Sequence, residues 1–302
     1  MQLHNNDLVA LVSPAGYLAD KDIVSQAQAL LKKWGLRSYI GNNALKQHGH
    51  FAGTDLQRLE DLQEAMNNPE VKMIWALRGG YGSIRIVDDL DFANFKKHPK
   101  IFTGFSDITI LHNRIQQVGF ESLHAFMPVQ LKEKISRKVI RQTKNAWFGR
   151  KLNYSFPKSK FTTNFSEVEA VVTGGNLANL YSVLGTPLDL DMQEKILFIE
   201  EVGEQLYQID RMIIAMKKAG KFNGLKALLV GQFTGIPENQ PGFGQSFQEI
   251  ILEHTAGYDF PVIFDAPVGH ITNNYPLMLG RKLSLQATGQ QIILSQKPDI
   301  SV

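Results

Sequence analysis

Short apolar runs and amphipathic helical segments alternate along the first part of the chain. The helical segments begin at Asp20 and Thr54, and each repeats its apolar residues at helical spacing. The apolar runs lie at residues 8–12, 37–40, 71–77 and 101–103. Because strands that alternate with helices form parallel crossover units, this pattern predicts an α/β domain built on a parallel sheet.

A change of pattern after residue 150 divides the 302-residue chain. We predict an N-terminal α/β domain over residues 1–150, which carries the nucleophile discussed below. A linker is predicted over 151–167, because residues 153–167 are polar and show no clear period. A C-terminal domain over 168–302 is expected to be rich in β-strands, since two apolar runs near its end flank a Thr-Gly turn.

The composition excludes several kinds of site. The chain has no cysteine, which removes disulfides, thiolate metal ligands and a cysteine nucleophile, and we expect neither a metal nor another cofactor. The net charge is only +3, and its one basic concentration, residues 132–151, has the spacing of a solvated helix face. We therefore expect no nucleic-acid partner.

The N-terminal residues also bear on the cellular location of the protein. They lack a basic region, and their apolar run is too short for the core of a signal peptide or for a membrane span. The prediction is a cytoplasmic protein with no membrane partner.

Ser106 lies where an apolar run ends and a helical segment begins. Gly104 and Ser106 match the nucleophile-elbow pattern G-x-S-x-G, although Ile108 replaces its second glycine. Such a turn exposes the serine hydroxyl and places the next backbone N–H groups at a helix N-terminus, where they can stabilise an oxyanion. A simple helix-capping role for the serine is the structural alternative.

A glycine-rich loop follows the strand predicted at 71–77. It reads Arg78-Gly79-Gly80-Tyr81-Gly82, and it lacks the lysine and hydroxyl ending of a phosphate-binding loop. Loops at the carboxyl ends of parallel strands share one edge of a sheet, so this loop is expected to face the Ser106 turn. Its glycines can present backbone N–H groups to a substrate oxygen, and Arg78 can pair with a carboxylate. A tight turn with a surface arginine is the alternative.

A serine nucleophile needs a base, and a third group to orient that base. Among the eight histidines, His270 follows a predicted strand and a Pro-Val-Gly loop that would hold the ring in place. His112 is expected to point away from the turn, and His124 to be a core or supporting residue. Glu200, at the tip of another predicted strand, can serve as the orienting carboxylate. Five histidines are expected to be solvated: His4, His48, His50, His98 and His254.

Seven short motifs, in order along nearly the whole chain, resemble the LD-carboxypeptidases of the S66 serine peptidase family. They are SPAG (13–16), RGGYG (78–82), GFSDIT (104–109), GGNL (174–177), FIEEVGE (198–204), IDR (209–211) and PVGH (267–270). One departure is Glu201, which occupies a position where many relatives have aspartate.

The resemblance implies a fold, a triad and a substrate. The N-terminal domain would resemble class I glutamine amidotransferases. A homodimer is also implied, because members of this family often form one. The triad would be Ser106, Glu200 and His270. The reaction implied is hydrolysis, through an acyl-enzyme, of the amide between the L-centre of a diamino acid and the terminal D-alanine of murein tetrapeptide during cell-wall recycling.

Several further residues are predicted to line this site. The backbone N–H groups of Asp107 and of Gly79 or Gly80 would hold the oxyanion. We expect Arg78 to bind the terminal carboxylate, with Tyr81 and Gly82 beside it as further substrate-binding residues.

Two other functions stay open from the sequence. A microcin-immunity peptidase of the same family would cleave an acyl-sulfamoyl adenylate and would need an aromatic residue to stack the adenine, for which Phe243 and Tyr275 are the candidates. A non-catalytic protein would use Ser106 and Arg78 only to hold a carboxylate or a peptide. Labelling of Ser106 by a fluorophosphonate distinguishes this last possibility from an enzyme.

Overall fold

The computed structural model describes residues 1–238 and 240–297. The described chain divides into two compact units. The first comprises Met1–Arg150 together with Tyr275–Met278, and the second comprises Lys151–Asn274 together with Leu279–Lys297. The segment Tyr275–Met278 was expected in the C-terminal domain, but it belongs to the first unit.

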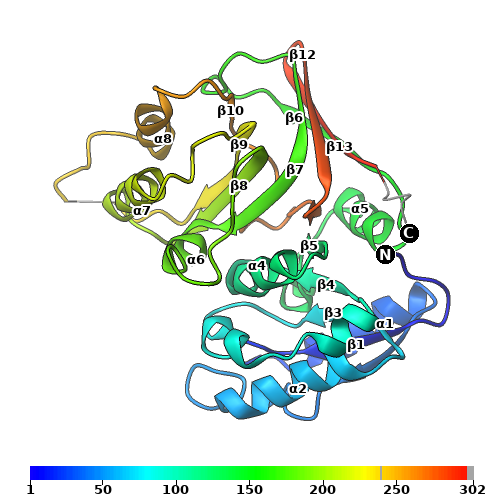
Figure 1. Cartoon of the computed structure of the whole chain (residues 1–302). Helices are drawn as coiled ribbons and strands as arrows, with labels where there is room; N and C mark the ends of the chain where they lie inside the picture. The colour runs from blue at the N-terminus through cyan, green and yellow to red at the C-terminus, as the bar shows by residue number, and fades with distance from the viewer. Residues whose placement is uncertain (239, 298–302) are drawn as a thin grey trace. The chain divides into compact units, whose positions relative to one another are not determined.

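The first unit contains a six-stranded sheet in the order β11-β5-β4-β3-β1-β2. Figure 1 labels four of these strands, β5, β4, β3 and β1. Strands β1 to β5 pair in parallel, which confirms the predicted architecture. The strands are β1 (Leu8–Val12), β2 (Arg37–Ile40), β3 (Val71–Ala76), β4 (Ile101–Gly104), β5 (Ser122–His124) and β11 (Leu277–Leu279). The helices are α1 (Asp22–Lys33), α2 (Asp55–Asn67), α3 (Ala93–Lys97), α4 (Thr109–Gln117) and α5 (Arg137–Trp147), with short 3-10 turns η1 (Ser83–Arg85), η2 (Val87–Asp89), η3 (Ser106–Ile108) and η4 (Pro128–Lys132).

The central strands of this sheet are buried on both faces. Four of the five residues of β1 and five of the six of β3 are buried, as expected where helices cover both sides of a parallel sheet. Trp75 of β3 packs edge-on against Trp147 and Phe126, and its indole N–H donates to the Phe126 carbonyl at 3.1 Å. This core supports the carboxyl ends of β3 and β4.

The second unit contains a seven-stranded mixed sheet in the order β10-β9-β8-β7-β12-β13-β6. Strands β7 to β10 are parallel, while β12, β13 and β6 are antiparallel. Its elements are β6 (Leu152–Pro157), β7 (Glu167–Asn176), α6 (Leu177–Ser182), β8 (Lys195–Val202), α7 (Leu206–Lys218), β9 (Ala227–Thr234), α8 (Phe247–Thr255), β10 (Val262–Ile263), β12 (Lys282–Thr288) and β13 (Gln291–Gln296). The unit is therefore rich in strands, and three helices follow its parallel strands.

The predicted linker over residues 151–167 is wrong, because this stretch contains a strand of the second sheet. Strand β6 pairs antiparallel with β13, and its residues alternate strictly between buried and exposed. Thr162 and Thr163 also accept hydrogen bonds from the backbone N–H groups of Phe264 and Val262, at 3.1 and 2.9 Å. The polar residues that suggested a linker include the outward side of an edge strand.

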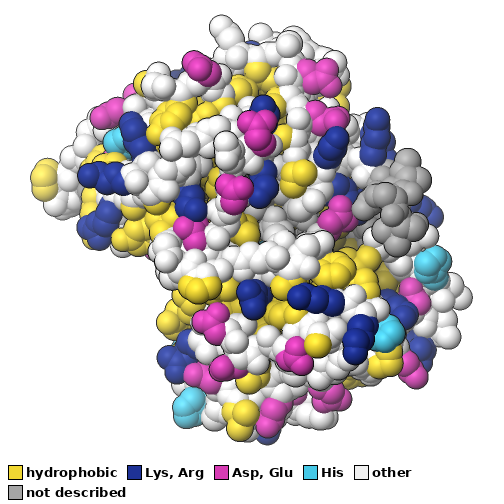
Figure 2. All heavy atoms as spheres, in the orientation of Figure 1, with side chains coloured by type: hydrophobic (Ala, Val, Ile, Leu, Met, Phe, Trp, Pro, Cys, Tyr) yellow, Lys and Arg dark blue, Asp and Glu magenta, His cyan; other side chains and the backbone are white. Residues whose placement is uncertain are grey.

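The surface carries charges of both signs. On the face drawn in Figure 2, Lys and Arg side chains are interspersed with Asp and Glu. In helix α5 the residues Arg137, Lys138 and Arg141 are exposed while Val139 and Trp147 are buried, as the spacing predicted. None of the helices in the described part of the chain combines the length and the apolar character needed to cross a bilayer.

Candidate active site

Ser106 occupies a strained turn between β4 and α4. Its φ angle is +67°, and only three other non-glycine residues of the described chain have a positive φ. A left-handed conformation costs a residue with a side chain about 1–2 kcal/mol, so the surrounding packing must maintain it. The N-cap residues of η3 and α4 are Phe105 and Ile108, so Ser106 caps neither helix. The predicted strand-to-helix turn is confirmed.

Gly104 and Ile108 of the G-x-S-x-I sequence pack directly against each other. A Cβ atom at Gly104 would lie 3.0 Å from both γ-carbons of Ile108. The isoleucine, which stands where the elbow pattern has its second glycine, packs into the space that the first glycine leaves open.

The glycine loop after β3 lies directly against Ser106. A Cβ atom on Gly79 would come within 2.8 Å of the serine Cβ and 3.0 Å of its Oγ, so the close approach requires glycine. The carbonyl of Gly79 accepts a hydrogen bond from the backbone N–H of Gly16 at 3.0 Å. Within the first unit the structure therefore brings the SPAG loop, the glycine loop and the Ser106 turn together.

The side chains of this loop have different surroundings. Arg78 is partly buried, and its Nη1 donates to the carbonyl oxygen of Tyr17 at 2.8 Å. Tyr81 is about half exposed, with its ring centroid 5.9 Å from that of Phe51. Arg78 is therefore held by Tyr17, the residue that follows the SPAG loop, while the Tyr81 side chain faces solvent.

Asp107 contributes a carboxylate that the sequence interpretation did not use. Its side chain is buried, and Oδ2 accepts the backbone N–H of Ser83 at 2.8 Å. Burial raises the pKa of Asp107, and hydrogen bonds from Ser83 and Gly82 and the charge of Arg58 oppose that rise. Sequence analysis also missed Arg58, although residues 58, 61, 62 and 65 of α2 are spaced as one buried helical face.

In the second unit, Glu200 and His270 form a close pair. Nδ1 of the imidazole donates to Oε2 of the carboxylate at 2.6 Å. Glu200 is fully buried near the tip of β8, while the side chain of His270 is 19% exposed. Burial lowers the pKa of His270, but the charge of Glu200 and its hydrogen bond outweigh burial, and Glu201 adds to them, so the net pKa is raised. This is the arrangement of a base held in one tautomer by a carboxylate.

The loop that carries His270 is tightly fixed. The Asn274 side-chain oxygen accepts the backbone N–H of Gly269 at 2.9 Å, and the Thr234 hydroxyl donates to the carbonyl of His270 at 3.2 Å. Gly269 has a φ of +130°, and a Cβ there would come within 2.9 Å of Glu200 Oε2. The glycine permits the carboxylate to approach the histidine loop.

Glu201, next along β8, has a different role from Glu200. It accepts hydrogen bonds from the Asn176 side chain at 2.9 Å and from the backbone N–H groups of Ala178 and Val202 at 2.7 and 2.8 Å. Burial, which these hydrogen bonds only partly offset, raises the pKa of Glu201 to about 7. Glu201 thus joins the tip of β8 to the start of α6.

Three other histidines are buried or paired with another side chain. His112 is fully buried, its Nε2 lies 3.0 Å from the Gly104 carbonyl, and burial lowers its pKa to about 4. His124 is also buried, with its ring 5.4 Å from that of Phe105. The expectation that His254 is solvated is wrong, because it pairs with Asp210 at 2.7 Å.

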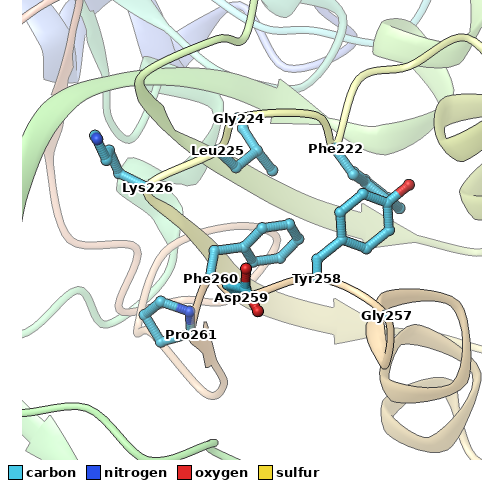
Figure 3. Close-up of a pocket in the computed structure, with 9 residues that line it drawn as sticks. All are labelled: Phe222, Gly224, Leu225, Lys226, Gly257, Tyr258, Asp259, Phe260 and Pro261. Atoms are coloured by element: carbon cyan, nitrogen blue, oxygen red, sulfur yellow. The ribbon is translucent and has the colours of Figure 1, made fainter.

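A hollow in the second unit lies at the amino ends of its parallel strands β9 and β10. Figure 3 shows it between the segment that leads into β9 and the segment that leads into β10. The rings of Phe222, Tyr258 and Phe260 contact one another there, at centroid distances of 5.4–6.3 Å. Glu200 lies near the carboxyl end of β8 and His270 follows the carboxyl end of β10, so this hollow is separate from them.

Comparison with known proteins assigns both units to one family. The family model of the LD-carboxypeptidase N-terminal domain matches residues 9–125, and that of the LD-carboxypeptidase C-terminal domain matches residues 169–285. The chain is 32% identical to the probable murein peptide carboxypeptidase of Bacillus subtilis, over 97% of this chain and 92% of that protein.

Solved structures agree with this assignment. The muramoyltetrapeptide carboxypeptidase of Oxalobacter formigenes is 28% identical, with a TM-score of 0.86 over 96% of this chain and 98% of that one. An MccF-like protein of Bacillus anthracis has the same fold, with a TM-score of 0.86 at 20% identity, over 99% and 98% of the two chains. The chain therefore belongs to the LD-carboxypeptidase family of S66 peptidases and is a serine-type hydrolase.

Proposed function

We propose that this hydrolase removes the terminal D-alanine from murein tetrapeptide, with Ser106 as nucleophile, His270 as base and Glu200 as the group that orients the base. The observation that carries the proposal is the 2.6 Å pair between Glu200 and His270, in a chain that resembles a probable murein peptide carboxypeptidase and a muramoyltetrapeptide carboxypeptidase. The positive φ of Ser106, at a strand-to-helix turn, supports its role as nucleophile.

The proposed reaction begins with attack of Ser106 Oγ on the carbonyl carbon that precedes D-alanine. His270 takes the hydroxyl proton through Nε2, while Nδ1 keeps its hydrogen bond to the carboxylate of Glu200. The carbonyl oxygen becomes an oxyanion, which the backbone N–H groups of Asp107 and of Gly79 or Gly80 would stabilise.

Collapse of this intermediate breaks the C–N bond. His270 returns the proton to the leaving nitrogen, and D-alanine departs with a neutral amine. A water molecule, deprotonated by the same imidazole, then attacks the acyl-serine, and the C–O bond to Ser106 breaks as the hydroxyl regains its proton. No step needs a metal or an organic cofactor.

Arg78 is proposed to bind the carboxylate of the terminal D-alanine, with Tyr81 and Gly82 beside it. An arginine suits this role because its planar guanidinium can engage a carboxylate through two hydrogen bonds. The Tyr17 carbonyl already takes one Nη1 hydrogen bond and would orient the remaining donors. The predicted homodimer, the cytoplasmic location and the likeness to glutamine amidotransferases stay predictions.

The test is mass spectrometry of the products that the purified protein forms from murein tetrapeptide. We expect loss of one D-alanine and release of the tripeptide. An acyl-sulfamoyl adenylate assayed in parallel tests the microcin-immunity alternative. Cleavage of the adenylate alone would replace the proposal, and binding of tetrapeptide without cleavage would favour a non-catalytic protein.

A further inference from the structure

A buried arginine of the first unit contacts both loops that follow β1 and β3. Arg58 lies on α2, and its side chain has no exposed surface. Its Nη1 donates to the carbonyl oxygens of Pro14 at 2.6 Å and of Gly82 at 2.9 Å. Its Nη2 binds Asp55, and the guanidinium carbon lies 4.9 Å from the centre of the Phe51 ring. The guanidinium therefore links the SPAG loop, the glycine loop and the start of α2.

The Asp107 carboxylate binds the opposite side of the peptide group that joins Gly82 to Ser83. The carbonyl of Gly82 and the N–H of Ser83 belong to one peptide bond. Arg58 donates to the carbonyl, and Asp107 Oδ2 accepts the N–H at 2.8 Å. This peptide is thus held between a buried cation and a buried anion. Gly82 has a φ of +136°, and a Cβ on it would come within 2.7 Å of Arg58 Nη1, so the contact also depends on glycine.

We infer that Arg58 and the Asp107 carboxylate form a clamp that positions the glycine loop against Ser106. The inference rests on the proposed function, because it concerns the N–H groups of Gly79 and Gly80 that would hold the oxyanion. The clamp ends one residue from Ser106, since Asp107 follows it directly, and Gly79 lies against the serine at the other end of the loop. Displacing such donors by about 1 Å costs on the order of 10²-fold in rate.

Both members are positioning residues, because neither side chain needs to contact the substrate. Hydrogen bonds to a charged group are stronger than those between neutral groups, and low-dielectric surroundings strengthen them further. Removal of the cation would leave the carbonyls of Pro14 and Gly82 without their buried donor, and it would remove a charge that favours the ionised carboxylate of Asp107. The loop would then shift without any loss of catalytic groups.

Lys100 offers a matched control in the same unit. It is also a buried cation that donates to two backbone carbonyls, those of Asn68 at 2.8 Å and His98 at 3.1 Å. It precedes β4, so it lies at the end of the sheet opposite to Ser106. Lys100→Met and Arg58→Met both remove a buried cation, but only the second removes the clamp.

The experiment measures kcat and KM for murein tetrapeptide, and the rate at which a fluorophosphonate labels Ser106, in the wild type and both variants. For Arg58→Met we expect kcat and the labelling rate to fall together by about 10- to 100-fold, with KM changed less than about twofold. Lys100→Met should keep both rates. Equal losses in the two variants, or a change confined to KM, would overturn the clamp.

Two milder variants keep the test informative if Arg58→Met does not fold. Arg58→Lys retains the charge with a different donor geometry, and Asp107→Asn retains an acceptor for Ser83 without the charge. Each should lower kcat by about tenfold with a normal melting temperature, and unchanged kcat in both would contradict the clamp.

If wild-type Ser106 is labelled but no D-alanine is released, the proposed function fails, while the labelling rates of the variants still test the clamp. A wild type that shows neither reaction overturns both.

Discussion

The two halves of the proposed active site are maintained by different physical means. At Ser106 itself, in the first unit, backbone conformation dominates: Ser106 has a positive φ, and Gly79 approaches it more closely than a residue with a Cβ atom could. In the second unit side-chain electrostatics dominate, because Glu200 is fully buried and hydrogen-bonds to His270 at 2.6 Å. The nucleophile half should therefore be most sensitive to changes of backbone and volume, and the base half to changes of charge.

The largest effect is expected at Ser106 itself. Both Ser106→Ala and Ser106→Gly should lower D-alanine release on the order of 10⁴-fold or more, because the nucleophile is lost. Their stabilities should differ, since glycine adopts a φ of +67° without a Cβ clash. We expect the glycine variant to be about 1 kcal/mol more stable than the alanine variant in urea denaturation. An active Ser106→Ala enzyme would end the proposal, and equal stabilities would contradict the backbone strain.

Glu200→Gln tests the electrostatic half. The substitution keeps the shape of the side chain but removes the Glu200 charge and alters the hydrogen bond, both of which raise the pKa of His270. Burial, which lowers this pKa, is then opposed mainly by the smaller effect of Glu201. We expect kcat/KM to fall on the order of 10³-fold. Because the imidazole must be neutral to act as base, the acidic limb of the pH profile should move to lower pH. An acidic limb at its wild-type position would show that Glu200 does not set the pKa of the base.

Gly79→Ala tests the close approach in the nucleophile half. The added methyl group would meet Ser106 at 2.8–3.0 Å, so either the loop or the serine must move. We expect kcat to fall by about 10- to 100-fold. Gly257→Ala is the matched control, because a Cβ there has nothing within 4 Å and its φ is not left-handed. Similar rates in both variants would mean that the loop tolerates displacement.

Arg78→Ala tests whether Arg78 binds the substrate carboxylate or only holds its own loop in place. Loss of a charged hydrogen-bond donor should raise KM by about tenfold for tetrapeptide with a free terminal carboxylate, and should change KM little for the amidated analogue. Steady-state kinetics on the two substrates make the comparison. Equal losses on both would assign Arg78 to the hydrogen bond with Tyr17 alone.

The smallest effect concerns Glu201 and the pH dependence of stability. Its pKa is about 7 in the folded chain, against an ordinary value of 4.5. Between these values the folded state binds more protons than the unfolded state, so this group's contribution to the free energy of unfolding falls as pH rises from about 4.5 to about 7. Glu201→Gln should remove that part of the slope in urea denaturation curves. A slope identical to that of the wild type would show that Glu201 is ionised throughout.

Much of the fold could be predicted because local patterns carry it. The alternation of buried runs and amphipathic helices predicted the parallel sheet of the first unit, with strand bounds close to those observed. The return of Tyr275–Met278 to the first unit could not be predicted, since it depends on distant pairing. Strand β6 was missed because the alternation of its six residues was lost within a longer polar stretch.

The geometry of the candidate site was predictable where a motif places a side chain at a strand end. This applies to the Ser106 turn and to the pairing of Glu200 with His270. The buried charged side chains were harder to find, because charged residues are usually exposed and a single one carries no signal of burial. His254 was misplaced for this reason, and the helical spacing of Arg58 with Leu62 and Ala65 was the signal that could have identified the arginine.

The proposed active site requires that His270 of the second unit activates Ser106 of the first. Its most direct test is the rate of fluorophosphonate labelling of Ser106 in the wild type and in His270→Ala, followed by mass spectrometry of the peptide that contains Ser106. We expect one adduct on Ser106 in the wild type, and labelling slower by on the order of 10²-fold or more without the imidazole. Equal labelling rates in the two proteins, or an adduct elsewhere than Ser106, would contradict it.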